Sequence, residues 1–214
     1  MVKTNLPKFP DSYIGKKAVE YDSLRWMERN QKRTTQKILN FLDDKKLGKI
    51  NHNFEKDLPL YILDLGCGTG FSSEILINAG FRVIGVDILE DMLSKANNKK
   101  TKLKSHNLEL ILADISHLPF KTISFHYIVS ISAYNFITHY YNSQREKVKI
   151  VNNTAKYLYK ILKDNGRIII EFYPENVEDL ELFTNSFILN GFEGFIVKTN
   201  PKQKSGQTFL LLKK

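Results

Sequence analysis

The chain has 214 residues, of which 42% are hydrophobic and 12% aromatic, and its formal net charge is +9. This length and composition fit one globular domain with a sizeable core and exclude a disordered chain. A single cysteine excludes an internal disulfide, and the apolar runs are too short for a membrane-spanning helix, which needs about 18 residues or more.

The N-terminal part of the chain is basic, and its apolar residues recur with helical spacing. Residues 1–59 contain 13 Lys and Arg against 8 Asp and Glu. This balance favours contact with the phosphates of a nucleic acid, although many lysine-rich surfaces bind nothing in particular. A helical pattern covers 18–42, and a polar stretch follows at 45–57. We therefore expect residues 1–57 to be a helical extension and linker that forms part of the substrate side.

The remainder, residues 58–214, alternates between apolar segments typical of strands and amphipathic segments typical of helices. We expect strands at 60–65, 82–86, 108–113, 126–132, 167–172, 194–198 and 208–212. We expect helices at 71–78, 89–98, 143–163 and 177–189. This alternation is typical of an α/β domain with a mostly parallel sheet. The loop at 199–207 is too short for a helical crossover, so the last two strands are expected to be antiparallel.

The first of these strands runs directly into a glycine-rich turn with Gly66, Gly68 and Gly70. Glycines let the backbone turn sharply and approach a ligand without a side-chain clash. Asp87 ends the next strand, where a carboxylate can accept hydrogen bonds from both hydroxyls of a ribose. The glycine spacing is tighter than the G-x-G-x-x-G of pyrophosphate-binding turns, and Asp64 precedes it, where a carboxylate could order the loop. These features indicate nucleotide-type binding and disfavour a dehydrogenase.

With Asp64-x-Gly66-x-Gly68-x-Gly70 as a first motif and Asp87 as a second, residues 58–212 resemble the class I S-adenosylmethionine-dependent methyltransferases. The resemblance implies a Rossmann-like, seven-stranded, mostly parallel sheet with an antiparallel last strand and helices on both faces. It also implies S-adenosylmethionine as cofactor and S-adenosylhomocysteine as product. The expected cofactor-binding residues are Asp64, Gly66, Cys67, Gly68, Asp87, Ile88, Asp114, Ile115 and Ser130.

Two of these residues have a simpler explanation beside the functional one. Asp114 stands where the family meets adenine and could accept from its exocyclic amine, but a helix-capping role would also explain it. Cys67 lies between the glycines, where small residues are common, so we expect a packing or backbone-contact role rather than nucleophilic catalysis. No Cys/His cluster with zinc spacing is present, and no metal site is expected.

The substrate is expected beyond the carboxyl ends of the fourth and fifth strands, where ligands of open α/β sheets bind. The segments there are 130–136 and 173–176. Neither contains the Asn/Asp-Pro-Pro-Tyr/Phe sequence, which argues against methylation of an exocyclic amino group. Capping of the next helix explains Asn176 but leaves Tyr173 and Glu175 unexplained.

These two segments, together with 180–182 and 191–192, resemble the family that methylates guanine N7 in small-subunit ribosomal RNA, over about residues 18–212. Gln31 and the helix after Tyr21 also match that family's N-terminal segment, whereas its long basic C-terminal extension has no counterpart before Lys214. The resemblance therefore implies an RNA substrate, specifically small-subunit ribosomal RNA.

This chemistry suits the residues, because guanine N7 carries a lone pair and can attack the methyl group without a general base. On this hypothesis Tyr134 or Tyr173 would stack on the target base. Glu175 would accept from the N1 and N2 hydrogens of guanine and so select it over adenine. Aromatic packing in the core would explain the tyrosines equally well.

The strand at 108–113 is expected at an edge of the sheet, and an exposed apolar edge is normally covered. Strand addition by another protein would cover it. The resembled family is activated by a small zinc-binding protein that pairs with this edge. The resemblance therefore implies a heterodimer in which the zinc belongs to the partner.

Two other functions remain open at this point. The same core serves lipids, quinones and metabolites, so a small-molecule methyltransferase is an alternative. A non-catalytic ribosome assembly factor that retains the cofactor pocket for stability is another. The first five residues lack the apolar stretch of a signal peptide, so we expect a cytoplasmic protein without membrane contact.

Overall fold

The computed structural model describes residues 8–48, 59–200 and 206–214. The strands are β1 (Tyr61–Leu65), β2 (Arg82–Asp87), β3 (Leu108–Leu112), β4 (Phe125–Ile131), β5 (Leu162–Phe172), β6 (Glu193–Lys198) and β7 (Thr208–Lys213). The helices are α1 (Lys16–Ser23), α2 (Arg25–Leu42), α3 (Phe71–Asn78), α4 (Glu90–Leu103), α5 (Gln144–Ile161) and α6 (Val177–Leu189). Short 3-10 helices form η1 (Lys45–Leu47) and η3 (Tyr134–Thr138).

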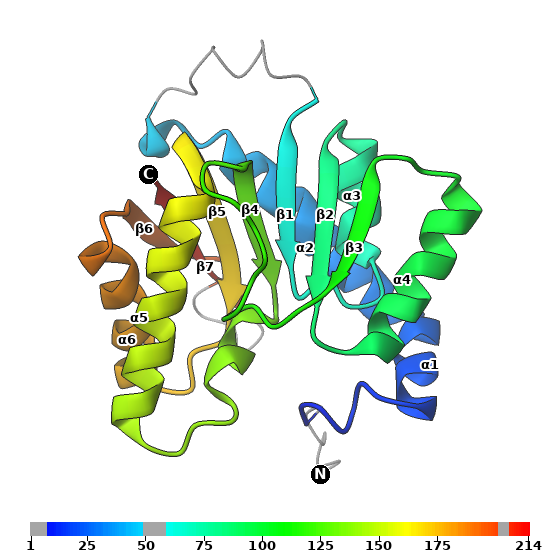
Figure 1. Ribbon diagram of the computed structural model, residues 1–214, viewed down its shortest axis with the longest axis horizontal. Helices are drawn as coiled ribbons and strands as arrows, with labels where there is room; N and C mark the ends of the chain where they lie inside the picture. Colours follow the sequence, from blue (N-terminus) through cyan, green and yellow to red (C-terminus); the bar gives the residue numbers. More distant parts are fainter. Residues whose placement is uncertain (1–7, 49–58, 201–205) are drawn as a thin grey trace.

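The strands form one seven-stranded sheet in the order β3-β2-β1-β4-β5-β7-β6 (Figure 1). The five strands from β3 to β5 are parallel, and β7 pairs antiparallel with both β5 and β6. The order reverses between β1 and β4, and ligands of open α/β sheets bind at the carboxyl ends next to such a switch point. The fold predicted from the sequence, including the antiparallel ending and the edge position of β3, is confirmed.

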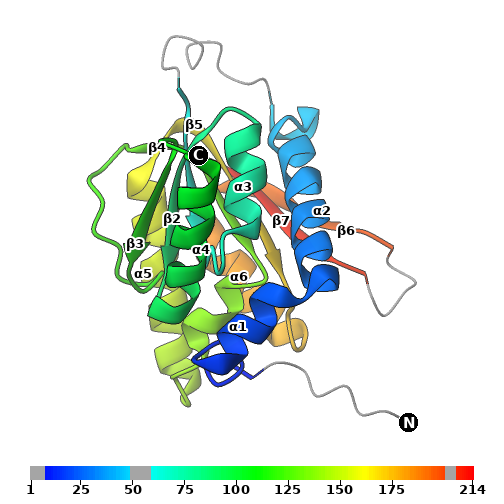
Figure 2. The same ribbon diagram turned by 90° about the vertical axis from the view of Figure 1, so that its right-hand side faces the viewer.

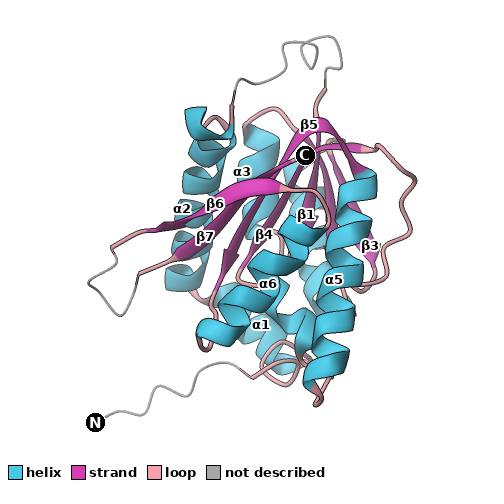
Figure 3. Cartoon of the chain, turned by 90° about the vertical axis from the view of Figure 1, so that its left-hand side faces the viewer, coloured by secondary structure: helices cyan, strands magenta, loops and turns pink. Residues whose placement is uncertain are grey.

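Helices cover both faces of the sheet, and each face has its own hydrophobic core. On one face α2 and α3 contribute Ile38, Leu42 and Leu76 to a cluster with inward residues of the central strands. Figure 2 shows these helices side by side with α4. On the other face α5 and α6 pack together, and their buried residues include Leu158 and Phe187 (Figure 3). None of the helices in the described ranges is long and apolar enough to cross a membrane.

The helix α2 belongs to the core rather than to a separate extension. Arg167 of β5, which is buried, donates from its guanidinium to the backbone carbonyls of Leu42 and Gly48, the latter at 2.7 Å. Leu47 in η1 is also buried. The polar stretch expected to be a linker at 45–57 therefore begins with an ordered 3-10 turn, and its residues 49–57 lie outside the described part of the chain.

The boundary between α5 and β5 differs from the prediction. The helix ends at Ile161 instead of continuing to Lys163, and the strand begins at Leu162 instead of Arg167. The pairing with β4 shifts register in this region, where Asn165 adopts a positive φ of 62°. Asn-Gly is common both at a helix C-terminus and in a bulged strand, and here Asn165 and Gly166 form a strand irregularity.

Candidate functional site

The turn after β1 has the backbone geometry that only glycine adopts without strain. Gly66, Gly68 and Gly70 have φ values of 69°, 55° and 85°. The N–H groups of Gly66 and Cys67 donate to the carbonyl of Val86 at 2.8 and 2.9 Å, which joins the turn to the end of β2. A Cβ atom on Gly66 would lie 2.2 Å from the Cβ of Ala133. The turn is therefore fixed in shape and closely packed, and Gly66, Cys67 and Gly68 line a cavity.

Asp64 connects this turn to α3. Its Oδ2 accepts from the hydroxyls of Ser72 and Ser73, both at 2.7 Å, in the first turn of the helix. The carboxyl group is 1% exposed, and burial raises its pKa from 3.8 to about 6 despite these hydrogen bonds. Asp64 is not among the residues that line the cavity, so it supports the turn from behind.

Asp87 stands at the end of β2, beside the turn. Its Oδ2 accepts from the N–H of Gly68 and its Oδ1 from that of Leu89, both at 2.9 Å. Burial raises the pKa of this carboxyl group, against the lowering effect of the backbone N–H groups. A carboxylate has about four acceptor positions, so acceptor capacity remains for a ligand. Because Asp87 lines the cavity, these positions suit the two hydroxyls of a ribose.

Two adjoining cavities share Gly66 and Asp87. The larger, of about 700 Å³, extends from the glycine turn to the ends of β4 and β5 and to α2. The smaller, of about 70 Å³, is lined by Ile88, Asp114 and Ile115. Apolar walls beside a ribose-binding carboxylate fit the adenine of a nucleoside. The Oδ1 of Asp114 accepts from the N–H and hydroxyl of Ser116, both at 2.7 Å, so this residue caps a turn as well as lining the cavity.

The structure puts Cys67 and Ser130, two other expected cofactor residues, in mainly structural positions. The thiol of Cys67 is buried, and burial together with the carboxylates of Asp64 and Asp87 raises its pKa, so it stays protonated. It packs against the backbone of Gly85. Ser130 is fully buried inside the sheet and donates to the carbonyl of Leu65 at 2.9 Å. The prediction that Ser130 contacts the cofactor is therefore wrong.

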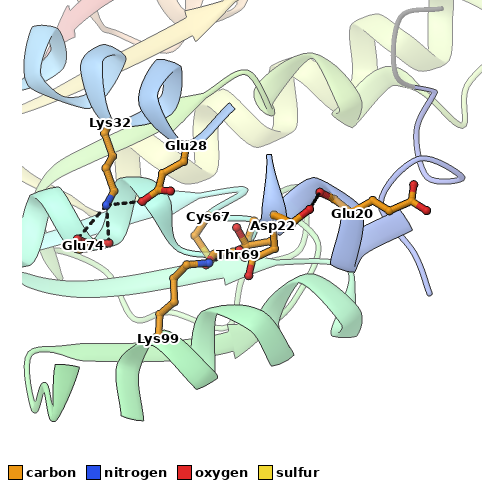
Figure 4. Close-up of polar contacts among 10 residues, drawn as sticks. Glu20, Asp22, Glu28, Lys32, Cys67, Thr69, Glu74 and Lys99 are labelled. Atoms are coloured by element: carbon orange, nitrogen blue, oxygen red, sulfur yellow. Dashed lines mark hydrogen bonds and ion pairs between the residues drawn. The ribbon is translucent and has the colours of Figure 1, made fainter. Parts of the chain in front are cut away.

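The N-terminal helices form a wall of the larger cavity and are bound to the glycine turn. Lys99 of α4 bonds the carboxylate of Asp22 and the carbonyl of Thr69, the latter at 3.0 Å (Figure 4). Its Nζ lies 4.3 Å from the ring centroid of Phe71. Lys32 of α2 pairs with Glu28 and, across to α3, with Glu74 at 2.9 Å. These contacts fix α1 and α2 over the site.

Residues ahead of α1 complete this wall. The ring of Phe9 stacks on Phe136 with centroids 4.6 Å apart, and Phe9 lines both cavities. The N–H of Gly15 donates to Asp91 of α4 at 2.8 Å. Gln31 also lines the larger cavity. It is one of the residues on which the N-terminal resemblance to the guanine-N7 family rests.

The three residues expected to contact the substrate lie in different environments. Tyr134 is 1% exposed and packs between the core rings of Phe183 and Phe187, each with its centroid 5.7 Å away. It is therefore not available to stack on a base, and that prediction is wrong. Glu175 is exposed, and it is not among the residues that line either cavity. Tyr173 lines the larger cavity and is 51% exposed, so it keeps the stacking role as a candidate.

A carboxylate that we did not single out from the sequence lies in the cavity instead. Glu171, near the end of β5, is 1% exposed and accepts from the hydroxyls of Ser132 and Tyr173 at 2.7 and 2.8 Å. The amide of Gln207 from β7's N-terminal flank also donates to it. The only sequence signal was an acidic residue within the apolar strand 168–172, which is unusual for a buried strand.

The arrangement of this site therefore suits the binding of a nucleoside next to a polar cavity. Within the described ranges, no cluster of three or more His, Cys, Asp or Glu side chains could hold a metal ion. The basic side chains of Arg33 and Lys37 line the cavity from α2. They suit an anionic substrate such as a polynucleotide.

Comparison with known proteins shows the family to which the chain belongs. A family model described as a methyltransferase domain matches residues 59–200. The chain is 34% identical over 157 residues to the 18S rRNA (guanine-N(7))-methyltransferase of Bos taurus, which covers 73% of this chain and 54% of that protein. It is 33% identical over 149 residues to the 18S rRNA (guanine(1575)-N(7))-methyltransferase of Saccharomyces cerevisiae, covering 67% and 51%. The chain thus spans about half the length of the curated relatives it matches.

A solved structure with a similar fold is the magnesium protoporphyrin IX methyltransferase from Synechocystis PCC 6803, determined with bound S-adenosylmethionine. The TM-score is 0.65 at 19% identity, and the match covers 95% of this chain and 94% of that chain. At this identity the likeness concerns the fold alone.

Proposed function

We propose, because this chain belongs to the methyltransferase-domain family of S-adenosylmethionine-dependent enzymes, that it methylates guanine N7 in small-subunit ribosomal RNA. One observation carries the proposal: a single cavity joins the glycine turn and Asp87 to the polar end of β5 beneath the basic face of α2. The relatives named as 18S rRNA guanine-N7 methyltransferases support the choice of substrate.

The residues present fit the cofactor. Asp87 would hold the ribose, and Ile88 and Ile115 would contact the adenine with Asp114 beside them. The methionine part would lie along the backbone of the glycine turn, where Ala133 leaves no room for a side chain at position 66. When bound, S-adenosylmethionine supplies an electrophilic methyl group on its sulfonium.

The chain's own contribution to catalysis would be positioning rather than proton transfer. Guanine N7 is unprotonated at neutral pH and needs no general base to act as a nucleophile. The cavity would hold the base in line and exclude water, and Tyr173 would stack on it. Residues 1–57 would belong to the substrate side, because Arg33 and Lys37 on α2 face the same cavity and suit the RNA backbone.

A protein partner is the second part of the proposal. The strand β3 lies at an edge of the sheet, and its Leu112 is 56% exposed. An exposed apolar edge is a template for strand addition. A small zinc-binding activator that pairs with residues 108–113 would cover it, and the zinc would belong to that partner. We also propose, as expected from the sequence, that the reaction takes place in the cytoplasm.

The test is nucleoside analysis by mass spectrometry of RNA incubated with labelled S-adenosylmethionine and the protein, with and without the candidate partner. We expect labelled 7-methylguanosine in small-subunit RNA. No label in any RNA, from a stable partnered protein that binds the cofactor, would overturn the RNA assignment. A small-molecule methyltransferase or a non-catalytic assembly factor would then take its place.

A further inference from the structure

We propose that Glu171 and Ser132 form a recognition site for a nucleobase with two adjacent N–H donors, which in RNA is guanine. The inference rests on the proposed function, since it concerns the substrate of the same cavity. Among the RNA bases, guanine alone presents neighbouring donors, at N1 and N2, on its Watson–Crick edge. Proteins that read an extruded base do so by hydrogen bonds to that edge.

The first argument is the environment of the Glu171 carboxylate. It is 1% exposed and lines the cavity. Its hydrogen-bond donors are the neutral groups of Ser132, Tyr173 and Gln207, and it has no ion-pair partner among the described residues. A buried carboxylate is unfavourable unless it is paired or fully hydrogen-bonded. Donors from a ligand would therefore stabilise this group.

The second argument is a count of acceptor positions. Tyr173 and Gln207 donate to Oε1, whereas Ser132 alone donates to Oε2. Oε2 thus has one acceptor position left. The hydroxyl oxygen of Ser132 lies 2.7 Å away and keeps its own lone pairs as acceptors. The cavity therefore presents two neighbouring oxygen acceptors, which complement the N1 and N2 hydrogens of guanine and repel the unprotonated N1 of adenine.

Backbone geometry supports a functional role for Ser132. It has a φ of 55°, in the left-handed region that disfavours a residue with a side chain. Its N–H contacts the carbonyl of Glu171 at 3.3 Å, and its hydroxyl contacts the carboxylate of the same residue. Strained backbone of this kind is concentrated at ligand-binding sites. Here the strain brings the Ser132 hydroxyl next to the carboxylate.

The position in the sheet also fits a purine. The glycine turn follows β1 and Glu171 lies near the end of β5, with β4 between them. Two strand spacings separate β1 from β5 by about 10 Å. A guanine bound through its N1 and N2 edge has its imidazole ring, which carries N7, on the side away from Glu171. It would therefore reach across β4 toward the glycine turn.

Gln207 holds Glu171 in place and connects it to α2. Its amide nitrogen donates to Glu171 and to the hydroxyl of Thr34, the latter at 2.7 Å. Its Oε1 accepts from Lys37 at 2.5 Å. The carboxylate is thus held by the side chains of Ser132, Tyr173 and Gln207. The base-recognition site would be ordered before the substrate binds.

The fluorescence of a tryptophan that lines the cavity can be used to measure binding at this site. Trp26 is the only tryptophan, lines the cavity and is 55% exposed, so its fluorescence will respond to a bound base. We would saturate the protein with S-adenosylhomocysteine and titrate a short oligoribonucleotide that has a single guanine among uridines. Matched oligomers would carry inosine, which lacks the N2 amine, or adenine at the same position.

We expect the wild-type protein to bind the oligomers in the order guanine, inosine, adenine. Glu171→Gln replaces an acceptor by an N–H donor and should weaken guanine binding about tenfold or more, because a charged hydrogen bond is lost. Adenine binding should change less than twofold. Glu175→Gln is the matched control, since that carboxylate is exposed outside the cavity, and it should behave as wild type.

Unchanged guanine preference in Glu171→Gln would overturn the inference, as would a wild-type protein that does not discriminate among the oligomers. S-adenosylhomocysteine affinity reports whether the variant is folded. If Glu171→Gln loses that affinity, Ser132→Ala is the deciding variant, and we expect its guanine preference to fall about threefold or more.

Methyl transfer is measured separately. A Glu171-dependent guanine preference without methyl transfer would reject the proposed function alone, and 7-methylguanosine formation with an unaltered preference would reject this inference alone.

Discussion

The two halves of the cavity are built in different ways. On the cofactor side, the turn, its supporting carboxylate Asp64 and the ribose-binding candidate Asp87 come from two consecutive strands and the turn between β1 and α3. On the substrate side, one network joins Thr34, Glu171 and Gln207, which are up to 173 positions apart in the sequence. The first half depends on local backbone geometry, and the second depends on the completed tertiary fold.

The largest effect on stability and binding should come from Gly66→Ala, which disrupts the local backbone geometry of the cofactor side. The new Cβ would lie 2.2 Å from that of Ala133, and the φ of 69° is unfavourable for alanine. Overpacking and left-handed strain together predict a loss of about 4 kcal/mol in the free energy of unfolding. Urea denaturation measures it, and calorimetry should show no S-adenosylhomocysteine binding.

The control for this variant is Gly80→Ala. Gly80 also has a positive φ, of 93°, but a Cβ there would meet nothing within 4 Å. Only backbone strain remains, so we expect the free energy of unfolding to fall by about 1 kcal/mol and the cofactor affinity to stay unchanged. If the two alanine variants are equally stable, close packing of the turn is not what determines its shape.

The second prediction concerns pH and Asp64, whose pKa is raised by burial from 3.8 to about 6. Between these pH values the folded protein keeps a proton that the unfolded chain has lost. The contribution to stability is therefore fully present below about pH 4 and is lost as the pH rises through 6, a change of about 3 kcal/mol.

Asp64→Asn should remove this pH dependence while keeping an acceptor for the hydroxyls of Ser72 and Ser73. Urea unfolding of both proteins between pH 4 and pH 8, without cofactor, is the measurement. The wild type should lose about 2 kcal/mol more of its free energy of unfolding than the variant over this range, most of the full effect. Parallel curves for the two proteins would show that Asp64 is ionised in the folded state at pH 4.

The third prediction is that Asp87→Ala weakens S-adenosylmethionine binding by about one to three kcal/mol, because a charged acceptor is lost. Isothermal calorimetry measures the affinity directly. Glu90→Ala is the control, since this carboxylate is exposed in the first turn of α4. Equal affinity in wild type and Asp87→Ala would remove Asp87 from the cofactor site.

The same contrast explains what could be predicted from the sequence. The order of the elements and the cofactor turn follow from periodicity, glycines and one aspartate, all of which are local signals. The start of β5 was missed because Asn165-Gly166 is an equally good signal for a helix end. On the substrate side, Glu175 and Tyr134 have the right residue types, but burial and the path of the chain after β5 decide which groups reach the cavity. Those choices depend on tertiary packing, which put Glu171 there instead.

The smallest effect on stability should come from Gln207→Met, which removes hydrogen bonds only from the long-range network of the substrate side. The variant keeps the volume of the side chain but loses its hydrogen bonds to Thr34, Lys37 and Glu171. We expect a loss of about 1 kcal/mol in the free energy of unfolding. Cofactor affinity should stay the same, because the glycine turn and Asp87 do not contact Gln207. Binding of the guanine oligomer should weaken, because Gln207 no longer holds the carboxylate of Glu171.

Gln144→Met is the control, since Gln144 is exposed at the start of α5. A parallel loss of cofactor affinity in Gln207→Met would mean that the two halves of the cavity are coupled, and that the substrate network also shapes the glycine turn.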